Sequence, residues 1–183
     1  MCTRMHATCL NYLCISLLLK KNKIQTNIMT LKKGDQAPDF KLYSSDKKEI
    51  SLADFNGKNL IIHFFPAAFT GVCTTQLCTL RDAITLYHND TTDVIAISVD
   101  SLFTLAKFKE DQQLNFTLLS DFNKVTCQAY GAYYSEFVFG MKGVARRAAF
   151  VVDKTGTIQY AEVLESAGDL PNFEAINAVL AAL

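Results

Sequence analysis

The sequence lacks the features that mark several classes of protein by composition alone. It has 18 basic and 18 acidic side chains and no net charge, so nothing favours nucleic acid or an anionic membrane as partner. It also contains no Cys-x-x-Cys pair, no phosphate-binding loop and no spacing of metal ligands. We therefore expect no cofactor and no bound metal.

A long hydrophobic run is also missing. Residues 10–19 are apolar, but a bilayer requires about 20 such residues, so no membrane span is expected. This short run lies within residues 1–28, which carry four basic side chains and no acidic one. A signal peptide and a transit peptide both remain open, although Lys20 and Lys21 follow the run and no small-x-small cleavage site is visible. The interpretation we favour is that Met29 is the start, with residues 1–28 disordered or not translated.

Cysteine usage indicates a reducing environment for the remaining single domain, residues 29–183. The chain has six cysteines, of which three fall within residues 1–28. The domain keeps Cys73, Cys78 and Cys127, an odd number that does not make a disulfide scaffold. With 183 residues, half of them hydrophobic, the chain can bury a core without such bridges. A cytoplasmic location is the expectation.

The hydrophobic pattern predicts strands that alternate with helices. Predicted strands cover residues 39–43, 49–52, 60–65, 94–99, 116–119, 148–152 and 157–163. Predicted helices cover residues 71–88, 102–113, 124–130 and 171–182. This order favours a central mixed sheet with helices on both faces, opened by an N-terminal hairpin and closed by an antiparallel one. The fold class is α/β, of the thioredoxin-like kind.

The segment around Cys73 carries the most specific chemistry. An apolar strand ends at Pro66, and a helix is predicted to begin at Gly71, so Cys73 lies in the first helical turn. Unpaired amides and the helix dipole favour a thiolate at such a position. Thr70 can donate a hydrogen bond to the sulfur or to a substrate oxygen, and Pro66 can shield the pocket. Together these residues predict an activated nucleophile.

The pattern Pro-x-x-x-Thr-x-x-Cys, at Pro66, Thr70 and Cys73, resembles the active-site signature of the peroxiredoxins. The resemblance extends from about Lys32 to the C-terminus, and further similar blocks lie at residues 34–40, 120–121 and 147–153. It implies a thiol-dependent peroxidase that reduces hydrogen peroxide and organic hydroperoxides through a cysteine sulfenic acid. It also implies recycling by thioredoxin or a similar thiol reductant, and a monomer or homodimer.

Arg147 is a second candidate for the active site, and it begins a predicted strand. An arginine on a buried sheet is rare unless paired, so Arg147 is expected to face the sulfur, favour its thiolate and position the peroxide. By resemblance, Arg147 matches the active-site arginine of the family. Arg146 is expected on the opposite face, because side chains alternate along a strand. His63, on the strand before Pro66, is expected to be a hydrogen-bonded core histidine.

Two cysteines are candidates to resolve the sulfenic acid. On one helix Cys73 and Cys78 are about 8.7 Å apart between Cα atoms and face directions about 140° apart. That distance exceeds the roughly 7 Å limit for a disulfide, so the helix must unwind before they bond. Peroxiredoxins similar to the bacterioferritin comigratory protein have a resolving cysteine at this Cys-x-x-x-x-Cys spacing. Cys127, in a short predicted helix, is expected to be a buried inert thiol, and a second resolving role is the alternative. Residues 141–147 and 171–175 also resemble the thiol peroxidase branch, so both branches stay open.

The principal alternative is a thioredoxin-like thiol-disulfide oxidoreductase. Such a protein is expected to have a Cys-x-x-Cys pair and a proline in the loop that faces the thiol. This chain has no such pair, and no proline lies between Pro66 and Pro171. The peroxidase is therefore favoured.

Overall fold

The computed structural model describes residues 30–87 and 90–183, so the expectations for residues 1–28 lie outside the described residues. The strands are β1 Lys41–Ser44, β2 Glu49–Ser51, β3 Asn59–Phe64, β4 Thr92–Ser98, β5 Thr117–Ser120, β6 Tyr133–Tyr134, β7 Val144–Ala145, β8 Ala148–Val152 and β9 Ile158–Val163. The helices are α2 Gly71–Asp82, α3 Ile84–Tyr87, α4 Leu102–Asp111, α5 Val125–Ala129 and α6 Phe173–Leu180, with 3-10 turns η1 Leu52–Phe55 and η2 Val138–Gly140.

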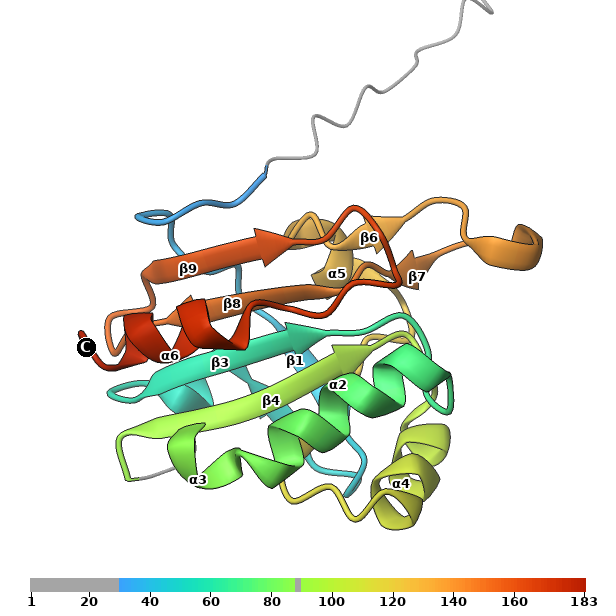
Figure 1. The fold of residues 1–183 in the computed structure, drawn as a ribbon, viewed down its shortest axis with the longest axis horizontal. Helices are drawn as coiled ribbons and strands as arrows, with labels where there is room; N and C mark the ends of the chain where they lie inside the picture. Colours follow the sequence, from blue (N-terminus) through green and yellow to red (C-terminus); the bar gives the residue numbers. More distant parts are fainter. Residues whose placement is uncertain (1–29, 88–89) are drawn as a thin grey trace, which may run out of the picture.

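Within the described residues, seven strands form one mixed sheet in the order β2-β1-β5-β4-β3-β8-β9 (Figure 1). β3, β4 and β5 run parallel, whereas β1 pairs antiparallel with β5 and β8 pairs antiparallel with β3. β9 pairs antiparallel with β8 and so runs in the same direction as β3. β1 and β2 form the N-terminal hairpin. The predicted mixed sheet with an opening and a closing hairpin is thus confirmed.

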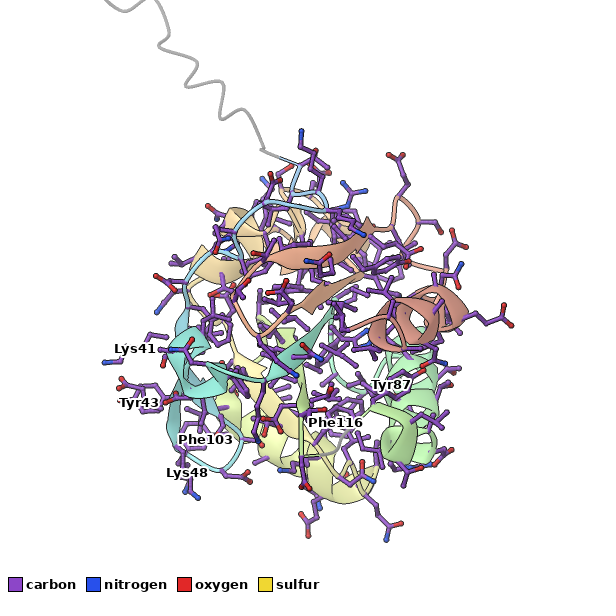
Figure 2. The ribbon with its side chains drawn as sticks, turned by 90° about the vertical axis from the view of Figure 1, so that its left-hand side faces the viewer. Lys41, Tyr43, Lys48, Tyr87, Phe103 and Phe116 are labelled. Carbon is purple, nitrogen blue, oxygen red and sulfur yellow. The ribbon has the colours of Figure 1, made fainter. Side chains whose placement is uncertain are left out.

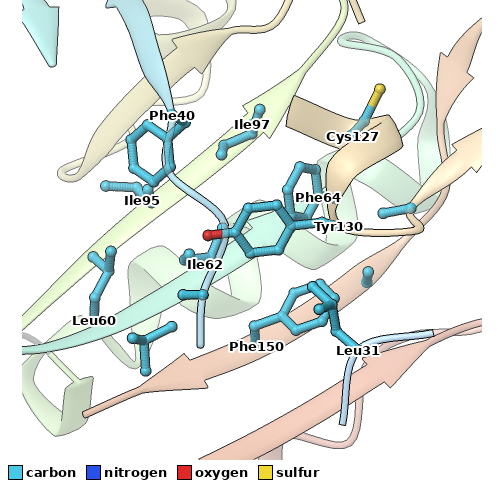
Figure 3. Packing of buried hydrophobic residues seen from close by; sticks show 14 of the residues in the cluster. Leu31, Phe40, Leu60, Ile62, Phe64, Ile95, Ile97, Cys127, Tyr130 and Phe150 are labelled. Carbon is cyan, nitrogen blue, oxygen red and sulfur yellow. The ribbon is translucent and has the colours of Figure 1, made fainter. Parts of the chain in front are cut away.

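Helices cover both faces of the sheet, but unequally. Because side chains alternate along a strand, Ile61 and Phe65 point to one face, where they pack with residues of α2, α3, α4 and α6. Ile62 and Phe64 point to the other face, beneath α5 and the chain segment that precedes β1. Figure 3 shows Tyr130 lying beside Phe64 on this second face, with Cys127 nearby on α5. β3 is buried along its whole length, as its continuous apolar sequence predicts.

Two local features differ from the sequence expectation. The predicted helix 71–88 is two helices, because Ala83 leaves the helical conformation (φ −98°, ψ 11°) and the chain turns there. Beyond this turn Tyr87 is buried against the sheet. The strands β6 and β7 form a small separate hairpin that was not predicted. Two-residue strands are too short to show any periodicity.

One edge of the sheet is β2, a strand of only three residues. Its Glu49 pairs with Lys41 of β1 at 2.8 Å, and Figure 2 shows Lys41 and Tyr43 projecting outward from β1. Short charged edges discourage pairing with further strands. No helix in residues 30–87 and 90–183 combines the length and the apolar character that a bilayer crossing requires.

Candidate active site

The loop between β3 and α2 lies at the carboxyl ends of the parallel strands, where α/β sheets commonly place their sites. Two contacts fix this loop. The Ala68 amide donates a hydrogen bond of 2.8 Å to the Asp100 carboxylate, which follows β4. Phe69 has a left-handed backbone (φ 64°), and its ring packs against Phe108 of α4 at 4.9 Å between centroids. A non-glycine residue in this conformation is uncommon and indicates that surrounding contacts hold the turn.

Cys73 is the third residue of α2, and only 1% of its surface is exposed. The first hydrogen bond within the helix is donated by Thr74 to the Thr70 carbonyl at 2.9 Å. The three amides before it, including that of Cys73, therefore have no partner within the helix. These amides and the positive end of the helix dipole face the region of the sulfur and favour negative charge there.

Thr70 and Pro66 complete the loop. Thr70 is the N-cap residue in an extended conformation. Its exposed hydroxyl donates to the Ala67 carbonyl at 2.9 Å and accepts no hydrogen bond from an amide of α2. In the described structure this hydroxyl makes no hydrogen bond to Cys73, and its oxygen keeps lone pairs free to accept one. Pro66 is buried directly after Phe65, where a missing N–H leaves no donor to satisfy.

Arg147 reaches Cys73 from the neighbouring strand. Ala148 of β8 pairs with Phe64 of β3, so the preceding residue, Arg147, lies at the same rim of the sheet as the active-site loop. Arg147 is 1% exposed, and its Nη2 donates to Cys73 Sγ at 3.5 Å and to the Ala167 carbonyl at 2.9 Å. A cation this close to a sulfur in a buried site favours the thiolate. Its Nε has no partner among the described residues.

Arg146 points elsewhere. Its side chain is half-buried, donates to the Leu164 carbonyl at 2.9 Å and lies over the Tyr134 ring at 5.3 Å. The two adjacent arginines therefore serve different parts of the molecule, as alternation of side chains predicts.

Gln76 and His63 extend the polar cluster beneath Arg147. The Gln76 carbonyl oxygen accepts a short hydrogen bond from Arg147 Nη1, and its amide nitrogen lies 3.3 Å from His63 Nδ1. Both side chains are fully buried. Burial, followed by the charge of Arg147, lowers the pKa of His63 to about 4, so its imidazole is neutral at physiological pH.

Gln76 and the Ala167 carbonyl are two further parts of the site that the sequence did not lead us to expect. A signal for Gln76 was present, because it lies three residues after Cys73 and hence on the same helix face. The contribution of Ala167 had no such signal, since a backbone carbonyl in an irregular segment carries no sequence pattern.

The other two cysteines lie away from this cluster. Cys78 is half-buried on α2, and its thiol contacts Gln112 Oε1 at 3.6 Å, beyond the end of α4. Cys127 is fully buried in α5, across the sheet from Cys73. Burial, then the neighbouring Asp121 carboxylate, raises the pKa of the Cys127 thiol far above its usual range. The three cysteines in the part of the chain that the structure describes, Cys73, Cys78 and Cys127, are free thiols.

Comparison with known proteins identifies the family. Residues 33–161 match the AhpC/TSA family. Peroxiredoxin Bcp of Escherichia coli is 37% identical over 132 residues, which are 71% of this chain and 84% of that protein. Among solved structures, peroxidoxin BcpB from Mycobacterium tuberculosis aligns with a TM-score of 0.73 and 25% identity, over 84% of this chain and 98% of that one. A peroxiredoxin-like protein from Aquifex aeolicus aligns with a TM-score of 0.75 and 28% identity, over 84% and 89% of the two chains.

The chain therefore belongs to the AhpC/TSA family and is a peroxiredoxin, the class of thiol-dependent peroxidases. The family, the thioredoxin-like fold and the enzyme class predicted from the sequence are confirmed.

Proposed function

We propose that Cys73 is the nucleophile of this peroxidase and that Arg147 activates it. The observation that carries the proposal is the 3.5 Å contact between Arg147 Nη2 and Cys73 Sγ in a buried site at the start of α2. The guanidinium and the free helical amides stabilise negative charge on the sulfur before reaction and on the oxygens during it. Thr70 supplies a hydroxyl at the entrance, and Pro66 closes one side.

The first step consumes one peroxide. The Cys73 thiolate attacks one oxygen of a hydroperoxide, an S–O bond forms and the O–O bond breaks. The sulfur is oxidised to a sulfenic acid, and the departing oxygen takes a proton to leave as water or an alcohol. Hydrogen peroxide and organic hydroperoxides are both proposed substrates.

The second step forms an intrachain disulfide with Cys78. The Cys78 sulfur attacks the sulfenic sulfur, and water departs as the S–S bond forms. Support for Cys78 comes from the half-exposed position of its thiol, whereas Cys127 is fully buried on the other face and its thiol resists ionisation. Because α2 runs unbroken from Gly71 to Asp82, its first turns must open before a bond limited to about 7 Å between Cα atoms can form.

A thioredoxin-type dithiol then returns both cysteines to thiols by disulfide exchange. The protein acts in the cytoplasm, as a monomer or a homodimer. These assignments follow from the cysteine usage and from the family, and light scattering of the purified protein measures the oligomeric state directly.

Peptide mapping after one equivalent of peroxide tests the resolving step. We expect a Cys73–Cys78 disulfide within a chain of monomer mass, and faster amide exchange over residues 72–79 than in the reduced protein. The Cys78→Ser variant should accumulate sulfenic acid at Cys73 after one equivalent of peroxide and sulfinic acid when a second is added, whereas the matched Cys127→Ser variant should turn over normally. A Cys73–Cys127 bond, or a bond between chains, would overturn the assignment of Cys78.

A further inference from the structure

His63 is the least explained polar residue in the sheet. It lies near the carboxyl end of β3, fully buried, on the face that carries Ile61 and Phe65. Its ring packs against Phe173 of α6 at 5.9 Å between centroids. Its Nδ1 faces Gln76, while its Nε2 has no partner among the described residues. A buried polar atom without a partner costs about 1–3 kcal/mol, so a purely structural role would be better filled by an apolar side chain.

The neighbours of His63 determine its protonation. Arg147 has only N–H donors, so the Gln76 carbonyl oxygen must face Arg147 Nη1 and the Gln76 amide must face His63. An amide facing His63 can only donate, and Nδ1 must therefore accept. The imidazole is then neutral, with its proton on Nε2. The charge of Arg147 thus selects one orientation of Gln76 and one tautomer of His63.

The same chain of contacts acts in the other direction. The guanidinium of Arg147 is oriented by two acceptors besides the sulfur, the Gln76 carbonyl oxygen on Nη1 and the Ala167 carbonyl on Nη2. Without an acceptor at His63, the Gln76 amide would be buried unpaired. The side chain would then move toward another acceptor, and that movement would draw its carbonyl oxygen away from Arg147 Nη1.

We propose that His63 is a positioning residue for the peroxidase reaction: its Nδ1 holds the Gln76 amide, which holds the Arg147 guanidinium against Cys73. His63 touches neither the sulfur nor the substrate in this arrangement. The inference rests on the proposed role of Cys73 and Arg147, and it adds His63 to that site as a residue that acts through Gln76 and Arg147.

Three variants of the full-length chain test this role. His63→Phe keeps a ring and removes the acceptor, and we expect the peroxide step to slow by about tenfold, the equivalent of one lost hydrogen bond. His63→Asn places its amide oxygen near the position of Nδ1, so it should restore most of the rate. Gln76→Leu removes the intermediate contact, and in this background His63→Phe should cost nothing further.

The readouts separate this role from a folding defect. Alkylation of Cys73, followed by peptide mass spectrometry across a range of pH, reports the thiolate without requiring peroxidase turnover. The profile should move to higher pH in His63→Phe and return in His63→Asn. Equal rates in His63→Phe and the wild type, or independent effects of the His63 and Gln76 variants, would overturn the proposal. Undiminished peroxide consumption by Cys73→Ser would instead overturn the proposed function, so the two failures are distinguishable.

Discussion

Cys73 and Cys127 are both buried near the start of a helix, and they pack against opposite faces of one sheet. The charged groups beside the two sulfurs have opposite signs. Cys73 faces the Arg147 guanidinium, and the amides of the first turn of α2 have no partner within the helix. Beside Cys127 lies Asp121, whose carboxylate accepts the amides of the first three residues of α5 at 2.7–3.1 Å. The start of α2 therefore places a cation beside Cys73, whereas the start of α5 places an anion beside Cys127.

The comparison shows that burial and a helix start are not sufficient for a reactive thiol. At α5 the carboxylate already satisfies the amides, and its charge opposes ionisation of the Cys127 sulfur, whose pKa is raised by burial and then by Asp121. At α2 the amides are left for the sulfur and for a substrate, and the adjacent charge is positive. What occupies the helix N-terminus decides the chemistry.

The largest expected effect contrasts the two cysteines directly. Cys73→Ser should reduce peroxide consumption to the uncatalysed background, because a serine hydroxyl is not ionised at neutral pH without an adjacent base. Cys127→Ser should keep the wild-type rate constant. Stopped-flow measurement of the peroxide step checks both variants. Loss of activity in Cys127→Ser, with folding retained by circular dichroism, would contradict the division of roles.

The next contrast uses the adjacent arginines. Arg147→Met should slow the peroxide step by about 10²- to 10³-fold, the range observed when one donor to a developing negative charge is removed. Arg146→Met should leave that step nearly unchanged, since Arg146 contacts Leu164 and Tyr134 instead. The measurement is the second-order rate constant with hydrogen peroxide. A larger effect in Arg146→Met would reverse the assignment.

The active-site face should also be the more sensitive to acid. His63 has a pKa of about 4 in the folded protein and about 6.5 when unfolded, so the unfolded state gains the proton first as the pH falls. The folded state therefore keeps its full stability above about pH 6.5, where His63 is neutral in both states. It loses stability as the pH falls from there to about 4, and the pKa shift of His63 corresponds to about 3 kcal/mol of the free energy of unfolding. Urea unfolding across this range should show a steeper loss in the wild type than in His63→Asn, and parallel curves would argue against a neutral buried imidazole.

The parts of the Cys73 site differ in how far they could be predicted from the sequence. Pro66, Thr70 and Cys73 lie within eight residues that follow one strand, so a local pattern predicts the strand end and the helix start that hold them. Arg147 was expected near Cys73 because the alternation of side chains along a strand and the family resemblance both predict that its side chain faces the sulfur. The Ala167 carbonyl and the pairing of Gln76 with His63 depend on packing between distant elements, which no local pattern records. The break at Ala83 likewise lacks the glycine or proline that would have marked it.

The smallest expected effect concerns Asp121 and sharpens the comparison from the other side. Asp121→Asn removes the negative charge and one of the two carboxylate oxygens that accept three amides, so it should reduce the free energy of unfolding by about 2 kcal/mol. It should also make Cys127 alkylate faster at high pH, because the repulsion that opposes its thiolate is gone. Urea unfolding and peptide-resolved alkylation measure the two effects, with Asp169→Asn on the exposed surface as the matched control. If Cys127 alkylated no faster in Asp121→Asn than in the control, burial alone would account for its inertness, and the contrast of charges between the two helix starts would not be the cause.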